Sequence, residues 1–314
     1  MTDNANNSPS LAGQSSGQQF PAAAPPPPKK GLPPRATFAI LGVALLFVLM
    51  PYLFWQASWF GRPLTDQQLS RYLGDAEHPR NAQHGLVQLS ERIDRRDPGV
   101  SRWYPQVIAL TRNPETQVRL TAAWVMGHDN ASSEFHQTLL GMLSDSDPMV
   151  RANAALSLVR FADAAGRPQI RALLEPQIIV APRAGTLNPR LKITDVVRPG
   201  TLIARILVPD VDSHGKVEKG SSAGEKTEVR SAVPGRVERW LAADGAAVTA
   251  GQPLLELSPS PENVWEALRA LYLIGQADDL TVVQSFTRAS GDMPPGIQQQ
   301  AALTLQAIRS RSGS

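Results

Sequence analysis

The chain has 314 residues, a formal net charge of +3 and no cysteine. Its length allows about two domains with a normally buried core, and the absence of cysteine excludes disulfide bonds and thiol catalysis. The small net charge is spread along the chain, so the sequence offers no basic stripe for nucleic acid, and we expect no nucleic-acid partner.

Residues 1–34 have the composition of a disordered tail. They are rich in Asn, Ser, Gln, Gly, Ala and Pro, and a run of prolines precedes Lys29 and Lys30. A segment with so few bulky apolar residues has too little surface to bury to offset the entropy of folding. We therefore expect disorder, with a short polyproline II stretch at the prolines.

Residues 36–60 form an apolar stretch without a formally charged side chain. About 25 such residues are enough to span a bilayer with some tilt, and Tyr52, Trp55 and Trp59 supply an aromatic belt near the C-terminal end. Lysine and arginine are concentrated on the N-terminal side, which predicts a cytoplasmic tail. A cleaved signal peptide is the alternative, but bulky aromatics stand where a small-residue cleavage site would be needed. We therefore expect an uncleaved single-pass anchor in a bacterial inner (cytoplasmic) membrane, with the bulk of the chain in the periplasm.

A helix is predicted immediately after residue 147. Asp145 or Asp147 can cap its N-terminus, and Pro148 falls in the first turn, where a missing N–H leaves no hydrogen bond unmade. Apolar residues then recur on one face at helical spacing. Val150 begins a frame in which two alanines, four and five residues later, precede a large apolar residue.

The same frame recurs along the chain. It begins at Val118, which is 32 residues before Val150, and again at Trp265 and Ile297, which are also 32 residues apart. A fixed period of this length is typical of helical solenoids. The paired alanines, followed by a large apolar residue, predict close packing between the second helices of successive hairpins.

Residues 147–166, DPMVRANAALSLVRFADAAG, resemble the HEAT-like repeat family. The resemblance implies an α-solenoid of about five hairpins, distributed over residues 64–176 and 260–310. Solenoids of this kind mostly bind other proteins along a concave face.

Three tryptophans of the predicted hairpins have two interpretations. Trp103, Trp124 and Trp265 either fill the core or present a binding surface. Apolar periodicity usually reports burial, so the sequence favours the core for all three.

The interval between Val150 and Trp265 is 115 residues, which is 83 more than one repeat of 32 residues. The surplus lies between Leu174, at the end of one predicted helix, and Asn263, at the start of the next. Within it, helical periodicity stops and Val, Ile, Gly and Pro dominate, with turns every few residues. We therefore expect an all-β domain, residues 178–258, inserted into the turn of one HEAT hairpin.

The two halves of the predicted β domain are alike. Val197 and Gly200 in the first half match Val248 and Gly251 in the second, an offset of 51 residues. The glycines suit tight turns that need a positive φ. The second half, SAVPGRVERWLAADGAAVTAGQPLLEL, resembles the biotinyl/lipoyl barrel-sandwich family, which implies a flattened β sandwich built from two half-motifs.

This resemblance bears on cofactors and partners. Carrier proteins of the family hold a modified lysine before the second half, and that position falls on Gly224, with Lys216, Lys219 and Lys226 nearby. We therefore expect no biotin, lipoyl group or other cofactor. The remaining relatives are membrane-fusion-protein (HlyD-like) adaptors of efflux and type 1 secretion systems, which join an inner-membrane anchor to an unmodified domain. Residues 207–228 are too short to form the long helical hairpin that often separates the halves of such adaptors.

No catalytic, cofactor-binding or metal-binding residues are predicted. The five histidines show no metal-site spacing, and we expect His128 and His136, which bracket a loop, to be solvated. Capping explains the aspartates at predicted helix ends, which are Asp94, Asp97, Asp145 and Asp147. Residues 220–227 nearly match a phosphate loop, but Glu225 interrupts the required Gly-Lys pair, so we expect a hairpin loop.

The sequence as a whole predicts a membrane-anchored multidomain protein, an α-solenoid interrupted by an all-β barrel-sandwich domain. Its expected role is non-catalytic: holding or coupling protein partners at the cell envelope. The most specific form is a membrane-fusion-type adaptor of an efflux or secretion system, which contacts a transporter and self-associates through the β domain. The alternatives are a membrane-tethered HEAT scaffold or regulator unrelated to transport, and a biotin or lipoyl carrier subunit.

Overall fold

The computed structural model describes residues 43–47, 49–50, 52, 63–75, 77–208, 226–288 and 293–313. The chain divides into two compact units, Met1–Arg62 and Pro63–Ser314. In the first unit, the described residues between 43 and 52 are helical and expose large apolar side chains such as Phe47 and Tyr52. The predicted tail and most of the predicted span lie outside the described residues. No helix in the described part of the chain is both long and apolar enough to cross a membrane.

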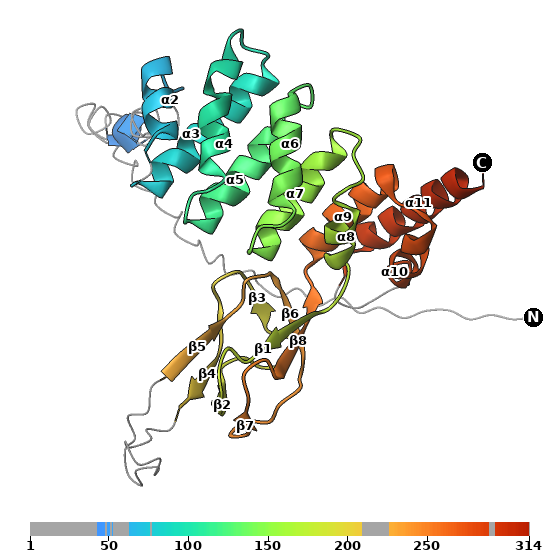
Figure 1. Cartoon of the computed structure of the whole chain (residues 1–314). Helices are drawn as coiled ribbons and strands as arrows, with labels where there is room; N and C mark the ends of the chain where they lie inside the picture. The colour runs from blue at the N-terminus through green and yellow to red at the C-terminus, as the bar shows by residue number, and fades with distance from the viewer. Residues whose placement is uncertain are drawn as a thin grey trace, which may run out of the picture. The chain divides into compact units, whose positions relative to one another are not determined.

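The second unit contains an array of helix pairs (Figure 1), so the predicted helical repeats are confirmed. The first helices of the pairs are α2 (Asp66–Leu73), α4 (Tyr104–Leu110), α6 (Ser133–Met142), α8 (Arg167–Ala172) and α10 (Leu280–Ser285). The second helices are α3 (Pro79–Asp94), α5 (Thr116–Met126), α7 (Pro148–Val159), α9 (Pro261–Ile274) and α11 (Pro295–Ser312). Short 3-10 helices precede α4 and α10, namely η2 (Val100–Trp103) and η3 (Ala277–Asp279).

Short polar residues begin several of these helices. The carboxylate of Asp147 accepts hydrogen bonds from the backbone N–H groups of Met149 and Val150, at 2.8 and 3.4 Å, at the start of α7. Ser260 caps α9 in the same way through the N–H of Asn263, at 3.2 Å. Each cap satisfies donors that the first helical turn leaves unpaired.

Two hydrophobic clusters fill the helical array. One extends from α2 to α7, and the other joins α7 and α8 to α9, α10 and α11. The paired alanines of α5 and α7 are fully buried, as the sequence predicts; they are Ala122, Ala123, Ala154 and Ala155. The two helices approach closely enough for the Oγ of Ser157 on α7 to donate to the carbonyl oxygen of Ala123 on α5, at 2.8 Å.

The predicted core positions of the tryptophans are correct for only one of the three. Trp103 is 2% exposed, but Trp124 is 41% and Trp265 is 38% exposed. In α9, Val264 rather than Trp265 occupies the buried first position of the repeating frame. The interval from Val264 to Ile297 is therefore 33 residues, one more than the sequence pattern indicates.

A β-rich region lies between α8 and α9 in the chain (Figure 1), so the mixed architecture is confirmed. Its described strands pair antiparallel in two four-stranded sheets, with the orders β1-β8-β6-β3 and β5-β4-β2-β7. The strands are β1 (Gln177–Val180), β2 (Gly185–Pro189), β3 (Val196–Val197), β4 (Leu202–Leu207), β5 (Lys226–Arg230), β6 (Gly235–Trp240), β7 (Ala247–Val248) and β8 (Pro253–Pro259). Buried side chains from both sheets, including Leu187, Ile206 and Leu257, form one hydrophobic core.

The strands reproduce the internal offset of 51 residues. Shifting β2, β3 and β4 by this offset brings them onto β6, β7 and β8, and β1 then overlaps β5. The same exchange converts the strand order of one sheet into that of the other. The equivalent turn residues Gly200 and Gly251 have φ values of 85° and 79°, as the sequence predicts. Each sheet contains strands from both halves, so neither half can complete a sheet by itself.

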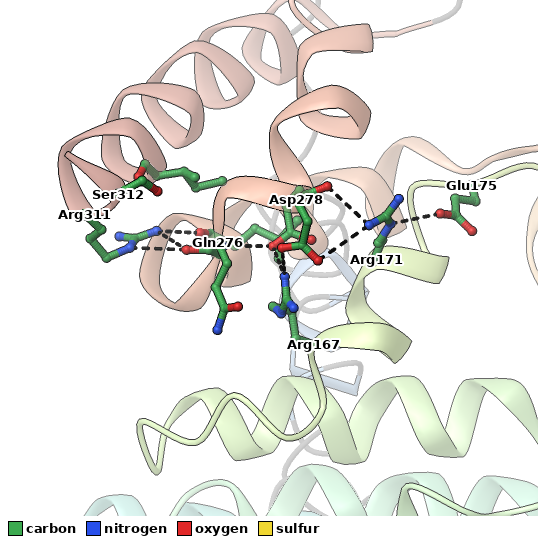
Figure 2. A network of polar contacts seen from close by, with 11 residues as sticks. Arg167, Arg171, Glu175, Gln276, Asp278, Arg311 and Ser312 are labelled. Atoms are coloured by element: carbon green, nitrogen blue, oxygen red, sulfur yellow. Dashed lines mark hydrogen bonds and ion pairs between the residues drawn. The ribbon is translucent and has the colours of Figure 1, made fainter.

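Polar contacts join helices on either side of the β-rich region (Figure 2). From α8, Nη1 of Arg167 donates to the carboxylates of Asp278 and Asp279, the latter at 3.0 Å. Nη1 of Arg171 donates to the carbonyl oxygen of Asp278 at 3.2 Å. Arg311 of α11 donates to carbonyl oxygens at the end of α9. Arg167 and Asp278 are 111 residues apart, so no local pattern in the sequence predicts their contact.

Candidate protein-binding groove

A groove of about 840 Å³ lies along the second helices α5, α7, α9 and α11. Trp124, Leu156, Tyr272, Leu273 and Leu303 are among its lining residues. Leu273 is 61% exposed, and Trp124, Tyr272 and Leu303 are each exposed by more than 40%. The groove therefore presents large apolar and aromatic side chains to solvent.

The repeating frame explains why these side chains gather in one groove. The sixth residue after the buried first position is Trp124 in α5, Leu156 in α7, Ala270 in α9 and Leu303 in α11, and all four line the groove. Each residue advances about 100° around a helix axis, so the sixth position lies about 120° away from the first. From the sequence, the two alanines and the large residue after them are expected to pack together between the second helices. In α5 and α7 the structure instead puts the paired alanines in the helix contact and the large residue in the groove.

Trp124 packs against a histidine side chain. Its ring centroid lies 4.4 Å from that of His128 in edge-to-face geometry, and Nδ1 of His128 lies 2.8 Å from Oδ1 of Asp94. The His128 side chain is 9% exposed, so the expectation of a solvated histidine is wrong there. His136 is 30% exposed and lies 2.7 Å from a carboxylate oxygen of Asp163, so it is only partly solvated. Asp94 is thus engaged in orienting an imidazole, not in the expected capping.

Charged side chains border the groove. Arg160, Glu266 and Arg269 belong to its lining, and Nη1 of Arg269 lies 3.8 Å from Oε1 of Glu266. This pair is exposed and contributes little to stability. Large aromatic and aliphatic anchors beside arginines are the composition typical of energetic hot spots in protein interfaces. The groove can therefore bind a protein segment without any reacting group.

The other sequence features with described positions do not line the groove. Among the residues with described positions, no group of three or more His, Cys, Asp or Glu side chains could hold a metal ion. Lys226, one of the lysines near the carrier position, begins strand β5. Gly224, Lys216 and Lys219 fall outside the described residues, as does most of the segment that resembles a phosphate loop.

Comparison with known families agrees with the helical part of this structure. The family model for HEAT repeats matches residues 104–180, which contain α4 to α8. A comparison with curated proteins finds no match. The helices α4 to α8 within this match therefore form a HEAT-like repeat segment, a type of module that commonly binds other proteins. Helices α5 and α7 of this segment contribute Trp124 and Leu156 to the groove.

Proposed function

We propose that this chain is a non-catalytic adaptor or scaffold at the cell envelope, which binds a protein partner in the groove along α5, α7, α9 and α11. The observation that carries the proposal is the exposure of Trp124, Tyr272, Leu273 and Leu303 on one groove. Soluble surfaces rarely gather large apolar side chains in one hollow unless a ligand covers them. Because these side chains project from packed helices, a partner can bury them at a small cost in conformational entropy.

The rim of the groove favours a partner segment that combines apolar anchors with carboxylates. Arg160 and Arg269 outnumber Glu266 among the charged lining residues. Opposite charges on the partner would steer its approach and set its register. The apolar side chains would supply most of the affinity, since hot spots are buried at the centre of an interface.

The envelope location rests on the sequence of residues 36–60 and on the exposed apolar side chains between residues 43 and 52. In this arrangement the segment anchors the chain in a bacterial inner membrane, and the second unit lies in the periplasm.

The β-rich region supports a finer form of the proposal. Its two interlocked halves support an assignment to the biotinyl/lipoyl barrel-sandwich class. On the sequence resemblance to membrane-fusion adaptors, the partner would be a transporter of an efflux or secretion system. A HEAT scaffold or regulator unrelated to transport is the alternative.

Site-specific photo-crosslinking tests the groove. A photoreactive amino acid in place of Leu273 should form a protein adduct in native membranes. The matched control is Val87, which is 40% exposed on α3 and lies outside the groove lining, and which should form none. Leu273→Asp alters an exposed side chain, so the fold should persist, while partner recovery should fall about 30-fold, as for the loss of a hot spot of ~2 kcal/mol. Equal adducts at both positions, or recovery unchanged by Leu273→Asp, would reject the groove as the binding site.

Self-association through the β-rich region is a second candidate function. In the sheet β1-β8-β6-β3, both edge strands expose apolar side chains: Ile178 and Val180 on β1, and Val196 on β3. Edge strands of this kind are open to pairing with another chain. Sedimentation velocity of the full chain in detergent should show an oligomer, and the double change Ile178→Lys and Val180→Lys should give a monomer. If the chain without these substitutions is already a monomer, the result favours the HEAT scaffold unrelated to transport.

The intact mass of the purified protein distinguishes the adaptor from the carrier alternative. The adaptor proposal expects the mass of the unmodified chain. A biotin or lipoyl increment that disappears in Lys226→Ala would replace the adaptor with a carrier subunit.

A further inference from the structure

Positive charge in the second unit is concentrated in the β-rich region. Its described residues, 177–208 and 226–259, contain nine lysines and arginines against five aspartates and glutamates. The described residues of the helical array contain 16 against 17. The small net charge of this unit is therefore not spread evenly, and the excess of cations lies on the β strands and the turns that connect them.

Three of these cations lie along one edge of the sheet β1-β8-β6-β3. They belong to the edge segment (residues 190–198), which runs from the end of β2 through β3. Arg190, Lys192 and Arg198 are exposed, and among the described residues none of their side chains has a hydrogen-bond or ion-pair partner. On the other sheet, by contrast, Glu228 pairs with two arginines, at 3.2 and 2.7 Å. The edge segment therefore carries three uncompensated positive charges.

Two large apolar side chains lie between these cations. Ile193 is 58% exposed and Val196 is 64% exposed. The one acidic residue of the edge segment is Asp195, whose carboxylate accepts a hydrogen bond from the backbone N–H of Lys192 at 2.7 Å and so stabilises the turn. The edge segment therefore presents both uncompensated cations and aliphatic surface to solvent.

Hydrogen bonds fasten the edge segment to β6. The N–H of Thr194 donates to the carbonyl oxygen of Val237 at 2.8 Å, and the N–H of Val237 donates to the carbonyl oxygen of Asp195 at 2.9 Å. Nε1 of Trp240 donates to the carbonyl oxygen of Leu191 at 3.2 Å. Because the backbone is already held in place, the outward side chains can meet a surface at a small cost in conformational entropy.

The second half of the β-rich region contains the same segment without these side chains. Residues 241–249 follow the edge segment by the offset of 51 residues, and the N–H of Gly245 donates to the carbonyl oxygen of Leu187 as that of Thr194 does to Val237. The equivalents of the three cations are Leu241, Ala243 and Thr249, and those of the two apolar residues are Asp244 and Ala247. Both β3 and β7 are edge strands, so cations that only guarded an edge against pairing would be expected at both. Neither the fold nor the edge therefore explains the cations of the first half.

The combination fits the surface of an anionic lipid bilayer. The negative surface potential strengthens binding about fivefold for each lysine or arginine near the surface, and aliphatic side chains gain by entering the boundary between headgroups and acyl chains. An acidic protein segment would attract the cations equally. Protein anchors are usually buried in pockets, however, and neither Ile193 nor Val196 lines the groove. Apolar side chains exposed on an edge favour a fluid surface, which can adapt to them.

We propose that the edge segment docks on anionic lipid headgroups, with its three cations at the phosphates and Ile193 and Val196 at the acyl boundary. The contact gives the chain a second attachment to the membrane, and a weak contact is enough because the anchor keeps the bilayer near. It rests on the proposed function only in requiring a bilayer close to the second unit. It does not involve the groove, and the substitutions on β1 that test self-association leave it intact.

Fluorescence quenching in proteoliposomes tests the contact. The chain has no cysteine, so Val196→Cys carries a single nitrobenzoxadiazole label, and Ala247→Cys, the equivalent position of the second half, is the matched control. The full chain is reconstituted in vesicles of phosphatidylcholine, alone or with an equal amount of phosphatidylglycerol, each containing a nitroxide lipid as quencher. The label at residue 196 should be quenched only with phosphatidylglycerol, and the label at residue 247 in neither case. Equal quenching at both positions overturns the proposal, and so does its absence at residue 196, which would leave an acidic protein as the partner.

The second half also supplies a variant that should fold. Arg190→Leu, Lys192→Ala and Arg198→Thr together copy it, and the loss of three cations should weaken docking about 100-fold and remove the quenching at residue 196. Unchanged quenching in this variant overturns the proposal. Should the variant not fold, salt takes its place: quenching that persists at about 1 M salt, where the Debye length is about 3 Å, also overturns it. Flotation of the chain with vesicles of phosphatidylcholine alone reports the anchor separately, so a failure of docking is distinguished from a failure of the proposed anchor.

Discussion

Asp145 connects two helix pairs through its charge. Its carboxylate accepts from Nε and Nη2 of Arg119 on α5, at 2.8 and 3.0 Å, and from the backbone N–H of Asp147 at 2.8 Å. The hydrogen bond from Arg119 is the main cause that holds the pKa of Asp145 below its ordinary value, and the N–H of Asp147 adds to it. Because the folded-state pKa is the lower one, the stabilisation is complete above the unfolded pKa of about 4 and is lost as pH falls through the folded value.

Asp145→Asn should lower the free energy of unfolding at neutral pH by about 2–3 kcal/mol, because a largely buried guanidinium loses its counter-charge. The deficit should shrink below about pH 4, where the unmodified chain also protonates this carboxylate. Urea unfolding at neutral and acidic pH measures both effects. Glu238→Gln removes an exposed carboxylate on β6 and is the control that should change neither. A deficit that is the same at both pH values would assign the loss to packing instead of charge.

Thr194 and Gly245 occupy equivalent turns, 51 residues apart, in the two halves of the β-rich region. Their φ values are 75° and 73°, a conformation that is unfavourable for a β-branched residue and neutral for glycine. Thr194→Gly should therefore stabilise the protein by about 1 kcal/mol, and Gly245→Ala should destabilise it by a similar amount. Thermal unfolding gives the sign of each change. Destabilisation by both would contradict the argument.

At the scale of elements, the β-rich region separates α8 from α9 along the chain, but the two helices remain packed together. Ile170 and Leu174 of the first segment share a hydrophobic cluster with Val264 and Leu268 of α9. The contacts of Arg167 add a polar connection from α8 to the segment that follows α9 (Figure 2). The helical core thus continues across the interruption.

Arg167→Met should destabilise the protein by about 3 kcal/mol, because the fully buried carboxylate of Asp279 loses its cation. Arg171→Met is the matched control: that side chain is 39% exposed, so its loss should cost about 1 kcal/mol or less. Native-state hydrogen exchange should show the largest loss of protection in α8 and α10. Equal effects of the two substitutions would mean that burial of the carboxylate does not decide the stability of this junction.

At the scale of the whole molecule, the proposed topology puts the tail and the helical repeats on opposite sides of a membrane. The chain has no cysteine, so single cysteines report location without a background. In intact spheroplasts, a membrane-impermeant maleimide should label Gln117→Cys, an exposed position on α5, and should not label Ser16→Cys in the tail until the membrane is opened. Labelling of Ser16→Cys alone would reverse the orientation, and labelling of neither before lysis would place both on the inside.

Features that arise from local periodicity could be predicted from the amino-acid sequence alone. The frame at Val118 and Val150 predicts the helix repeats, Asp147 predicts a cap, and the matched glycines predict the duplication of 51 residues in the β-rich region. Each prediction depends on a short motif, and the spacing of residues within that motif decides which side chains share a face or where a turn falls. The HEAT-like segment was therefore predictable. The membrane span at residues 36–60 and the barrel-sandwich class of the β-rich region stay predictions.

Which apolar side chains remain exposed depends on how the helices pack in the folded chain. The sequence pattern predicts burial for both Trp103 and Trp124. In the structure, neighbouring helices cover Trp103, whereas Trp124 is exposed in the groove. The contact of His128 with Asp94 likewise depends on residues from two different repeats. Periodicity specifies the face on which a side chain lies. Burial depends on what packs against that face, and that is set by contacts between segments far apart in the chain.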